Sequence, residues 1–335
     1  MAKRSDSSKA RVTVWEVSEL SGYSISTVSN VLNSPDIVAA ETREKVLKAI
    51  KELGYKPHAA ARNLKSRKSY SIGFPIYKSG LASVMGEFFR ELVEIADDRG
   101  YGITTFTVDE KGYAQSFQKL LDRGAVDGFM VAEVEQNDPR IAWLSENDIR
   151  FVAWGRTNNE RPYQWVDLDC TLGMDVLTDH VLSQGHKDIA YVGWNGEPTN
   201  QFRRDGVTQS MARAGLRLGK ARQLVVDFSV QGGERAADRL LKSQDPPNAI
   251  ICGHDIIAAG VIRRAKQLGF EIGKGNLIVT GSDDTPISLA TEPPITSIHF
   301  PLEDVARKLV KMFLAEKPMD NLLVAPKLVI RQSSS

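Results

Sequence analysis

GYSISTVSNVLNSP, which runs from Gly22 to Pro35, is the stretch of sequence on which the fold of the N-terminal part depends. Val28, Val31 and Leu32 recur at the spacing of one face of a short helix. The remaining positions are mostly Ser, Thr and Asn, which are weak helix formers that prefer caps and turns. The stretch therefore needs other helices to hold it, and its polar face is left open to solvent or to a partner.

Two better helices flank this stretch. Before it, TVWEVSELSG places Val14, Val17 and Leu20 on one stripe and stops at Gly22, which is free to take a positive φ. Two short helices around such a turn form a helix-turn-helix, whose second helix can lie in the major groove of DNA. An ordinary helical hairpin with a polar surface is the alternative. A third helix is predicted in AAETREKVLKAIKELGY, with Gly54 as its end and Val46, Leu47, Ile50 and Leu53 on its apolar face.

If the valines of the second helix face a core, its other side faces solvent or DNA. Asn can bond bidentately to adenine, and an apolar group can contact the thymine methyl. Short hydroxyl and amide side chains are suited to phosphate contacts. The predicted base-reading residues are Ile25, Ser26, Ser29 and Asn30, and the predicted phosphate-contacting residues are Thr13, Ser24, Thr27 and Asn33.

The charge of the chain is distributed unevenly. The net charge is only +1 over 335 residues, but residues 1–69 hold 13 Lys and Arg against 7 Asp and Glu. The rest of the chain is acidic. A basic head on an acidic body is expected when one part alone meets nucleic acid.

The segment from about residue 70 to the end alternates apolar strand-like runs with helical runs. Examples of the strand-like runs are YSIGFPI, YGITTFTV, DIAYVGW and LIVTGSDD. Repeated βα units indicate parallel sheets covered by helices. The length of this segment favours two such lobes over one.

These motifs together resemble the lactose-repressor (LacI/GalR) family of bacterial transcription regulators. The likeness lies in VTVWEVSELSGYSISTVSNVLN, in VAAETREKVLKAIKELGYKPHAAARNLKS and in the closing LVIRQSS, so it spans nearly the whole chain. Ser18, Ser21 and Tyr23 depart from the family pattern at positions that tolerate them. The resemblance implies an α/β protein with a three-helix helix-turn-helix head, a hinge helix and a two-lobed body with parallel sheets, similar to periplasmic binding proteins. The implied domains are 1–57 for the head, 58–69 for the hinge and 70–335 for the body, with lobe 1 at about 70–169 and 300–326 and lobe 2 at about 170–299 and 327–335.

The resemblance also implies a role for the basic, alanine-rich connector KPHAAARNLKSRKS. It would become a hinge helix in the minor groove, where an apolar wedge kinks DNA. The alternative is a flexible basic linker that contacts phosphates only. The residues carried over to the hinge are His58, Ala61, Leu64 and Lys65.

In the body, the resemblance implies a small-molecule effector, most often a sugar, held between the lobes. Charged pairs suit ligand hydroxyls, and flat aromatic faces suit their C–H surfaces. Without the family, Arg203 to Asp205 could be a solvated charge run, Asp283 and Asp284 could cap the next helix, and Trp143, Trp165 and Trp194 favour core or rim positions. The predicted effector-binding residues are Met85, Trp154, Arg156, Arg203, Phe228, His254 and Asp283.

Other classes of protein fit the sequence less well. No GxGxxG after a strand, GxSxG or P-loop is present, and the five histidines show no metal-ligand spacing, so neither an enzyme, a cofactor nor a metal is expected. His254 with Asp255 could still be read as an acid–base pair. A transport-associated sugar-binding protein would need a signal peptide, which the N-terminus does not resemble. The two cysteines lie far apart, no apolar run is long enough to span a membrane, and a cytoplasmic protein without a disulfide is expected.

The sequence thus predicts a homodimeric regulator that binds a pseudo-palindromic double-stranded DNA operator. No heptad run follows LVIRQ, which favours a dimer over a larger coiled-coil assembly. Repression of carbohydrate genes, relieved by a sugar, is the expected logic. Co-repression, or activation by a phosphorylated sugar or a nucleobase, is the alternative.

Overall fold

The computed structural model describes residues 12–33, 35–55, 68–77, 83–108, 112–157, 161–195, 198–273 and 275–335. The chain divides into two compact units, Met1–Ser69 and Tyr70–Ser335. Each unit is described by itself below.

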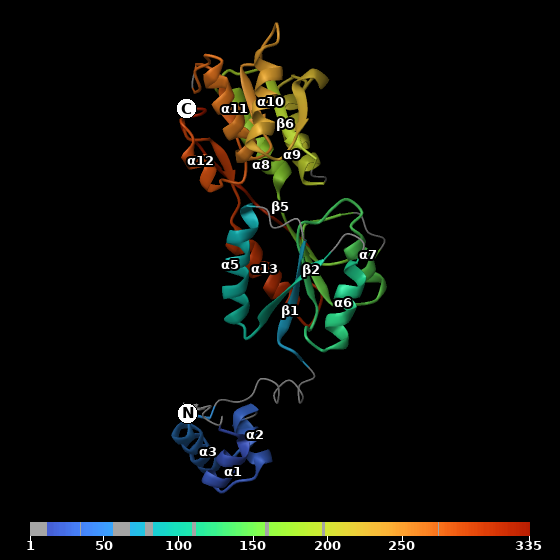
Figure 1. Ribbon diagram of the computed structural model, residues 1–335, viewed down its shortest axis with the longest axis vertical. Coiled ribbons are helices and arrows are strands. Elements are labelled where there is room, and N and C mark those ends of the chain that lie inside the picture. The colour runs from blue at the N-terminus through green and yellow to red at the C-terminus, as the bar shows by residue number, and fades with distance from the viewer. Residues whose placement is uncertain are drawn as a thin grey trace, which may run out of the picture. The chain divides into compact units, whose positions relative to one another are not determined.

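The described residues of the first unit form three α-helices and one short 3₁₀ turn. Thr13 begins the first of them through a capping box, in which the Glu16 carboxylate accepts a hydrogen bond from the Thr13 backbone N–H at 2.6 Å. Gly22 (φ 72°) and Gly54 (φ 63°) end two helices in the left-handed conformation that the sequence predicts for them. The elements are α1 (Val14–Ser21), α2 (Ile25–Asn33), the short 3₁₀ turn η1 (Pro35–Ile37) and α3 (Ala40–Leu53) (Figure 1).

Valines form the core of this unit. Val17, Val28 and Val46 are completely buried, and Leu32 packs against them while half-buried. The core-facing assignment of the second helix is therefore confirmed. Two predicted core positions are wrong, because Leu20 and Leu47 are 47% and 48% exposed. Each lies at the edge of its helical stripe, which three short helices cannot cover completely.

A six-stranded parallel sheet forms the first part of the second unit, which we call lobe 1. Helices α5 (Ser83–Asp97) and α13 (Leu302–Leu314) cover one face, and α6 (Tyr113–Asp122) and α7 (Pro139–Glu146) cover the other (Figure 1). The sheet order is β11-β5-β4-β3-β1-β2. The strands are β1 (Ser71–Tyr77), β2 (Gly102–Val108), β3 (Phe129–Val131), β4 (Phe151–Trp154), β5 (Trp165–Leu168) and β11 (Leu322–Val324).

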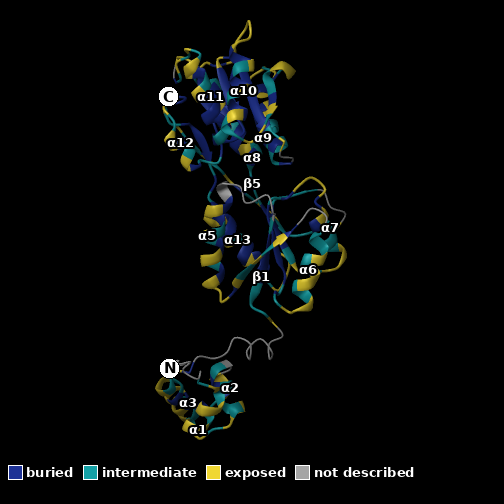
Figure 2. Cartoon of the chain, viewed as in Figure 1, coloured by how far each residue is buried: buried dark blue, intermediate teal, exposed yellow. Residues whose placement is uncertain are grey.

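A four-stranded parallel sheet, in the order β7-β6-β8-β9, forms what we call lobe 2. Its two faces bury separate apolar clusters, one under α8 and α9 and one under α10 and α11. In both lobes the central strands are buried, and the helices carry many exposed residues on their outer faces (Figure 2). The elements are α8 (Cys170–Ser183), β6 (Ile189–Trp194), α9 (Thr199–Arg213), η2 (Lys220–Arg222), β7 (Gln223–Val226), α10 (Val230–Leu241), β8 (Ala249–Cys252), α11 (Asp255–Gln267), β9 (Ile278–Thr280) and α12 (Pro286–Ala290).

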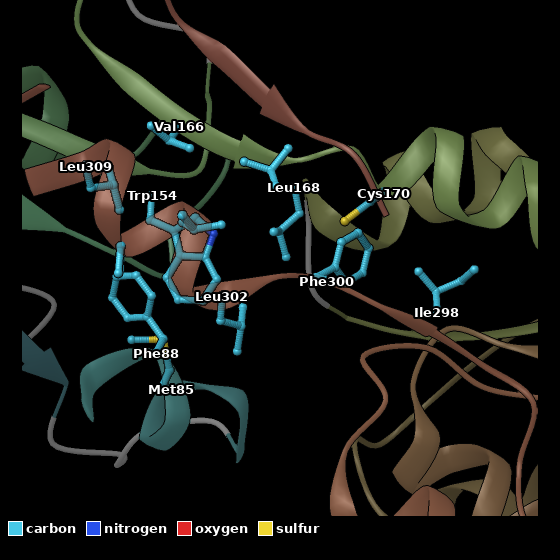
Figure 3. Close-up of a cluster of buried hydrophobic side chains, with 14 of the residues drawn as sticks. Met85, Phe88, Trp154, Val166, Leu168, Cys170, Ile298, Phe300, Leu302 and Leu309 are labelled. Atoms are coloured by element: carbon cyan, nitrogen blue, oxygen red, sulfur yellow. The ribbon is translucent and has the colours of Figure 1, made fainter. Parts of the chain in front are cut away.

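The chain passes between the two sheets more than once. Strand β5 belongs to lobe 1, and α8 directly after it packs against α9 in lobe 2. The strands β10 (Ser297–His299) and β12 (Lys327–Val329) form a separate antiparallel ribbon, while α13 and β11 between them return to lobe 1. The segments that pass between the sheets are apolar, because Leu168, Cys170, Phe300 and Leu302 belong to the same buried cluster as Trp154 and Met85 (Figure 3).

None of the described helices is long and apolar enough to cross a membrane.

Gly206 lets α9 lie close against α8, and this packing can be tested. A Cβ added at Gly206 would lie 2.2 Å from the Thr171 carbonyl oxygen. We expect Gly206→Ala to cost about 1–3 kcal/mol of stability, because backbone must move to admit the methyl group. Gly86→Ala on α5 is the matched control, since nothing lies within 4 Å of a Cβ there. Thermal unfolding of the full chain measures both, and equal midpoints for the two variants would contradict this packing.

Candidate functional site

The outer side of α2 presents the predicted base-reading residues. Ser26 is exposed, and Ile25, Ser29 and Asn30 are half-exposed, while Val28 and Val31 point into the core. A helix with one buried apolar face and one short polar face can enter a major groove. The geometry of α2 therefore permits the predicted contacts.

The predicted phosphate-contacting hydroxyls also begin helices. The Ser24 hydroxyl accepts a hydrogen bond from the Thr27 N–H at 3.2 Å and lies 2.9 Å from the Thr27 hydroxyl. The Thr13 hydroxyl donates to Glu16 at 2.9 Å. Each hydroxyl retains hydrogen-bonding capacity toward a further acceptor or donor. The side chain of Asn33, together with His58, Ala61, Leu64 and Lys65, lies outside the described residues.

Sequence reasoning missed two exposed large apolar residues of the first unit. Trp15 is 66% exposed in the first turn of α1, and Ile37 in η1 is 74% exposed. On a helical wheel, Trp15 lies outside the apolar stripe of Val14 and Val17, so its exposure could have been predicted from the sequence. Large apolar side chains in solvent are typical of interaction sites when they cluster.

The second unit contains a cavity of about 440 Å³ between the two lobes. Its size is in the range of ordinary small-molecule sites, and residues of both sheets line it. Parallel sheets place ligand groups at the carboxyl ends of their strands, and Trp154 and Trp194 end β4 and β6. All seven predicted effector-binding residues line the cavity: Met85, Trp154, Arg156, Arg203, Phe228, His254 and Asp283.

A buried ion pair lies in the lobe 2 wall of the cavity. Arg203 on α9 is 3% exposed, and its two terminal nitrogens donate to the Asp283 carboxylate at 2.6 and 3.2 Å. It also donates to the carbonyl of Gly253, which follows β8. Burial is the largest single effect and lowers the pKa of Arg203, but the attraction and hydrogen bonding of Asp283, together with smaller contributions from Cys170 and Tyr191, outweigh it, so the pKa of Arg203 lies above its ordinary value. The charge-run interpretation of Arg203 is therefore wrong.

Backbone conformation aims Asp283 into the cavity. Asp283 and Asp284 have φ values of 91° and 49°. Left-handed φ at a non-glycine residue costs about 1–3 kcal/mol and persists where surrounding contacts enforce it. The helix-cap interpretation of this pair is wrong, because Thr285 is the N-cap of α12.

Aromatic rings surround the ion pair. The Arg203 guanidinium lies 5.2 Å from the Trp194 ring centre, and Trp194 and Phe228 meet edge to face at 5.4 Å. Trp194 packs against the lobe 2 core and also lines the cavity, which fits the expected rim position. Trp143 stacks on Phe117 in the lobe 1 core, and Trp165 packs in the same cluster.

His254 is neutral and has a defined tautomer. Its Nδ1 accepts a hydrogen bond from the Ile256 N–H at 3.0 Å, so Nε2 carries the proton. Burial and the nearby Arg203 lower the pKa of His254 to about 4. The buried Nε2 lies 3.3 Å from Asp283 without an aligned hydrogen bond. This donor is available to a ligand oxygen.

Lobe 1 contributes a second ion pair. Arg156 Nε lies 3.2 Å from the Asp167 carboxylate without hydrogen-bond alignment, and burial raises the pKa of Asp167 to about 6. The Arg156 guanidinium also lies 4.2 Å from the ring centre of Phe202, the neighbour of Arg203 on α9. A cation of lobe 1 thus rests on an aromatic ring of lobe 2.

Sequence reasoning missed several lining residues. Asp167 had a signal, because it falls near the end of a strand, whereas Phe202 had only its position next to Arg203. The missed polar and aromatic lining residues are Glu133, Glu135, Asp167, Thr199, Phe202 and Phe300.

The acid–base interpretation of His254 with Asp255 does not match the geometry. The Asp255 carboxylate accepts hydrogen bonds from Ser297 at 2.6 Å and from the Thr285 N–H at 2.7 Å, and none from His254. Burial raises its pKa to about 7. Among the described residues, no group of His, Cys, Asp and Glu could hold a metal ion, and Cys170 and Cys252 are free, buried thiols.

A helix-turn-helix unit joined to a two-lobed α/β unit with a polar, aromatic-lined cavity defines the class of DNA-binding regulators with a binding-protein-like body. Comparison with known families agrees. Residues 13–58 match the family of bacterial regulatory proteins, lacI family, and residues 178–334 match the periplasmic binding protein-like domain.

Whole-length relatives give the family. The chain is 32% identical to the HTH-type transcriptional regulator AglR of Rhizobium meliloti (strain 1021), over 90% of this chain and 87% of the relative. It is also 32% identical to the HTH-type transcriptional repressor PurR of Glaesserella parasuis serovar 5 (strain SH0165), over 86% and 84% of the two chains. A lac repressor dimer bound to operator and the anti-inducer ONPF has the same fold, with a TM-score of 0.81 at 24% identity over 97% and 99% of the two chains. The chain belongs to the LacI family and is a helix-turn-helix transcriptional regulator.

The raised pKa of Asp167 gives a test of the lobe 1 ion pair. Because its pKa is higher in the folded chain than the ordinary 3.8, the stability it contributes is lost as the pH rises through about 6. Asn does not titrate, so the free energy of unfolding of Asp167→Asn relative to the natural chain should rise by about 2–3 kcal/mol from about pH 4 to 7. Urea unfolding at several pH values measures this, with the exposed Asp148→Asn as the control for net charge. A difference independent of pH would contradict the burial of Asp167.

Proposed function

We propose that the protein is a homodimeric repressor that binds a pseudo-palindromic operator and is released by an uncharged sugar bound in the cavity. The head is residues 1–57, the hinge 58–69 and the effector-binding body 70–335, with the lobe boundaries near 170, 300 and 327. The protein would act in the cytoplasm, where its operator lies. The Arg203–Asp283 pair in the cavity wall is the observation that carries the proposal.

The cavity suits an uncharged ligand. Both lining arginines already face a carboxylate, and Glu133 and Glu135 add further negative charge to the lining. A phosphate group would be repelled by this excess of carboxylates. Sugar hydroxyls can instead accept hydrogen bonds from Arg203 and His254 and donate to Asp283. The faces of Trp194 and Phe228 can cover the C–H surface of a sugar ring.

A link between effector and operator follows from the two-lobed cavity. A ligand shifts an equilibrium only by its differential affinity for two arrangements, and the effect must be reciprocal. Arg156 on Phe202 spans the lobes next to Arg203, so a ligand that displaces either side chain changes a contact between the lobes. Operator DNA should therefore weaken sugar binding by the same factor by which sugar weakens operator binding.

Co-repression by a nucleobase is the second candidate. The relative named as a PurR repressor supports it, and so does the aromatic lining, against which a flat base can stack. Activation by a phosphorylated sugar is less compatible with the carboxylates. A transport protein or a sugar-active enzyme has no use for a helix-turn-helix unit.

One experiment separates these candidates. A thermal-shift screen should include glucose, galactose, maltose, cellobiose, their phosphates, hypoxanthine and guanine, and each hit should be retested on an operator fragment. We expect an uncharged sugar to raise the melting temperature and to release DNA. A nucleobase that tightens DNA binding would establish co-repression, and a screen in which no sugar binds would refute the sugar proposal.

Asn30 is expected to read a base. Asn30→Ala should cost about 1–3 kcal/mol at one operator position, because a bidentate contact to adenine is lost. Binding to a library of single-substituted operators measures the change. An equal loss on every sequence would instead indicate a phosphate contact or a misfolded head, and Glu44→Ala, at an exposed position of α3 outside the predicted contacts, serves as the control.

Arg203 is expected to be needed for the effector response and not for DNA binding. Arg203→Ala should abolish release by the effector while operator affinity stays close to that of the natural chain. Removal of one partner leaves Asp283 buried and unpaired, at a cost of about 3–5 kcal/mol, so the assay belongs at low temperature with folding checked by circular dichroism. Arg213→Ala on the same helix is the control, because its side chain is 53% exposed. An unchanged response of Arg203→Ala would remove this residue from the site.

A further inference from the structure

The closing motif LVIRQSS, residues 328–334, has no role in the function proposed above, yet its polar side chains are buried. Ser333 and Ser334 are completely buried, and the side chain of Arg331 is only 14% exposed. Buried polar groups cost free energy unless they are hydrogen-bonded. The partners of these three residues therefore indicate what the motif holds in place.

Arg331 binds the residue next to the cavity aspartate. One terminal nitrogen donates to the Asp284 carboxylate at 2.7 Å. The other donates to the Ile295 carbonyl at 2.8 Å and lies 3.3 Å from the Ser288 hydroxyl. A planar guanidinium can satisfy several acceptors in a fixed geometry, which a lysine cannot. Arg331 thus fixes Asp284 to two neighbouring segments of lobe 2.

Asp283 and Asp284 point their carboxylates at different arginines. Asp283 faces Arg203 and the cavity, while Asp284 faces Arg331. Both residues have left-handed φ, which a side chain disfavours unless contacts hold it. The Asp283 N–H donates to the Ile298 carbonyl at 2.8 Å, and the Asp284 N–H donates to the Ser297 hydroxyl at 3.1 Å. The direction of Asp283 therefore depends on both the β10 segment and the anchor on Asp284.

The serines of the motif hold the same β10 segment. The Ser333 hydroxyl accepts a hydrogen bond from the Thr296 N–H at 2.9 Å, and the Ser334 hydroxyl lies 2.6 Å from the Thr296 hydroxyl. The Arg331 N–H donates to the Thr296 hydroxyl at 2.8 Å. On its other side, Thr296 accepts the Gly281 N–H at 2.9 Å. The motif thus contacts the support of Asp283 at two places.

We propose that Arg331 is a positioning residue of the effector site. It holds Asp284, and through the shared backbone it keeps the Asp283 carboxylate aimed at Arg203 and at the ligand. The proposal rests on the proposed function in one respect, because it takes Asp283 to bind the effector. The part concerning backbone position stands without any ligand.

The backbone part is tested first, by hydrogen–deuterium exchange of the unliganded full-length protein. Arg331→Gln removes the charge and the fork, and it should speed exchange of the peptide covering residues 281–285 by about tenfold, because local opening becomes easier. Arg331→Lys retains an ion pair with Asp284 and should give an intermediate rate. Asn adopts left-handed φ but carries no charge, so the Asp284→Asn variant should show the same faster exchange as Arg331→Gln.

Arg222→Gln is the matched control. Arg222 pairs with Asp188 at 2.5 Å in the same lobe, is 19% exposed, and lies at the end of η2, just before β7, away from the cavity. The Arg222→Gln variant should lower thermal stability without changing hydrogen–deuterium exchange at residues 281–285. Unchanged exchange there in both Arg331→Gln and Asp284→Asn would overturn the proposal. If Arg331→Gln does not fold, Arg331→Lys and Asp284→Asn decide the question.

The ligand part uses the sugar that gives the largest shift in the screen described above. Titration calorimetry should show weaker binding to Arg331→Gln by about 3- to 30-fold, the range found for residues that act without touching the ligand. Arg222→Gln and operator binding without sugar should stay unchanged. A lower melting temperature with unchanged affinity would show that Arg331 only stabilises the fold and would overturn the proposal. A screen without any sugar hit would refute the proposed function, while the exchange experiment would still decide whether Arg331 positions Asp283.

Discussion

The arrangement of lobe 2 depends on the need to neutralise one buried cation. Arg203 is almost completely removed from water, and a lone charge there would be prohibitively costly. Its partner Asp283 must therefore hold a backbone conformation that its side chain disfavours. Burying this pair is energetically costly, yet the pair lies at the cavity, where a ligand can bond both to its donors and to its acceptors. Stability alone would favour apolar residues of similar volume at such positions.

The two lobes meet through the same short region of α9. Phe202 lies under Arg156 of lobe 1, Arg203 faces the cavity, and Gly206 lets the helix pack tightly on α8. Helix α8 follows directly after β5, so α9 is packed against the chain at one of its passages between the lobes. A small displacement of α9 would therefore change the cavity wall, the contact with lobe 1 and the packing at this passage together.

Local sequence patterns predicted much of the fold and of the candidate site, and each of their failures has a physical reason. Helix periodicity placed Val28 in the head core, but it also assigned Leu20 and Leu47 to the core, because periodicity does not show how far three short helices can cover their own apolar stripes. The seven predicted lining residues, five carried over from the family and two placed by the end of a strand, all meet at one cavity. Asp167 and Phe202 were not predicted, because the role of each depends on a contact with Arg156, which follows β4 of lobe 1. The role of LVIRQSS was equally hidden, since its contacts join residues more than thirty positions apart.

The two cysteines have a practical consequence. Cys170 and Cys252 are buried, and burial raises the pKa of both thiols, to about 12 for Cys170. Thiolate is the reactive form, so neither residue reacts readily at neutral pH. A single cysteine introduced on an exposed face of each lobe would therefore take up maleimide or nitroxide labels selectively. Fluorescence transfer or spin–spin distances between such labels could follow the angle between the lobes in an otherwise natural chain.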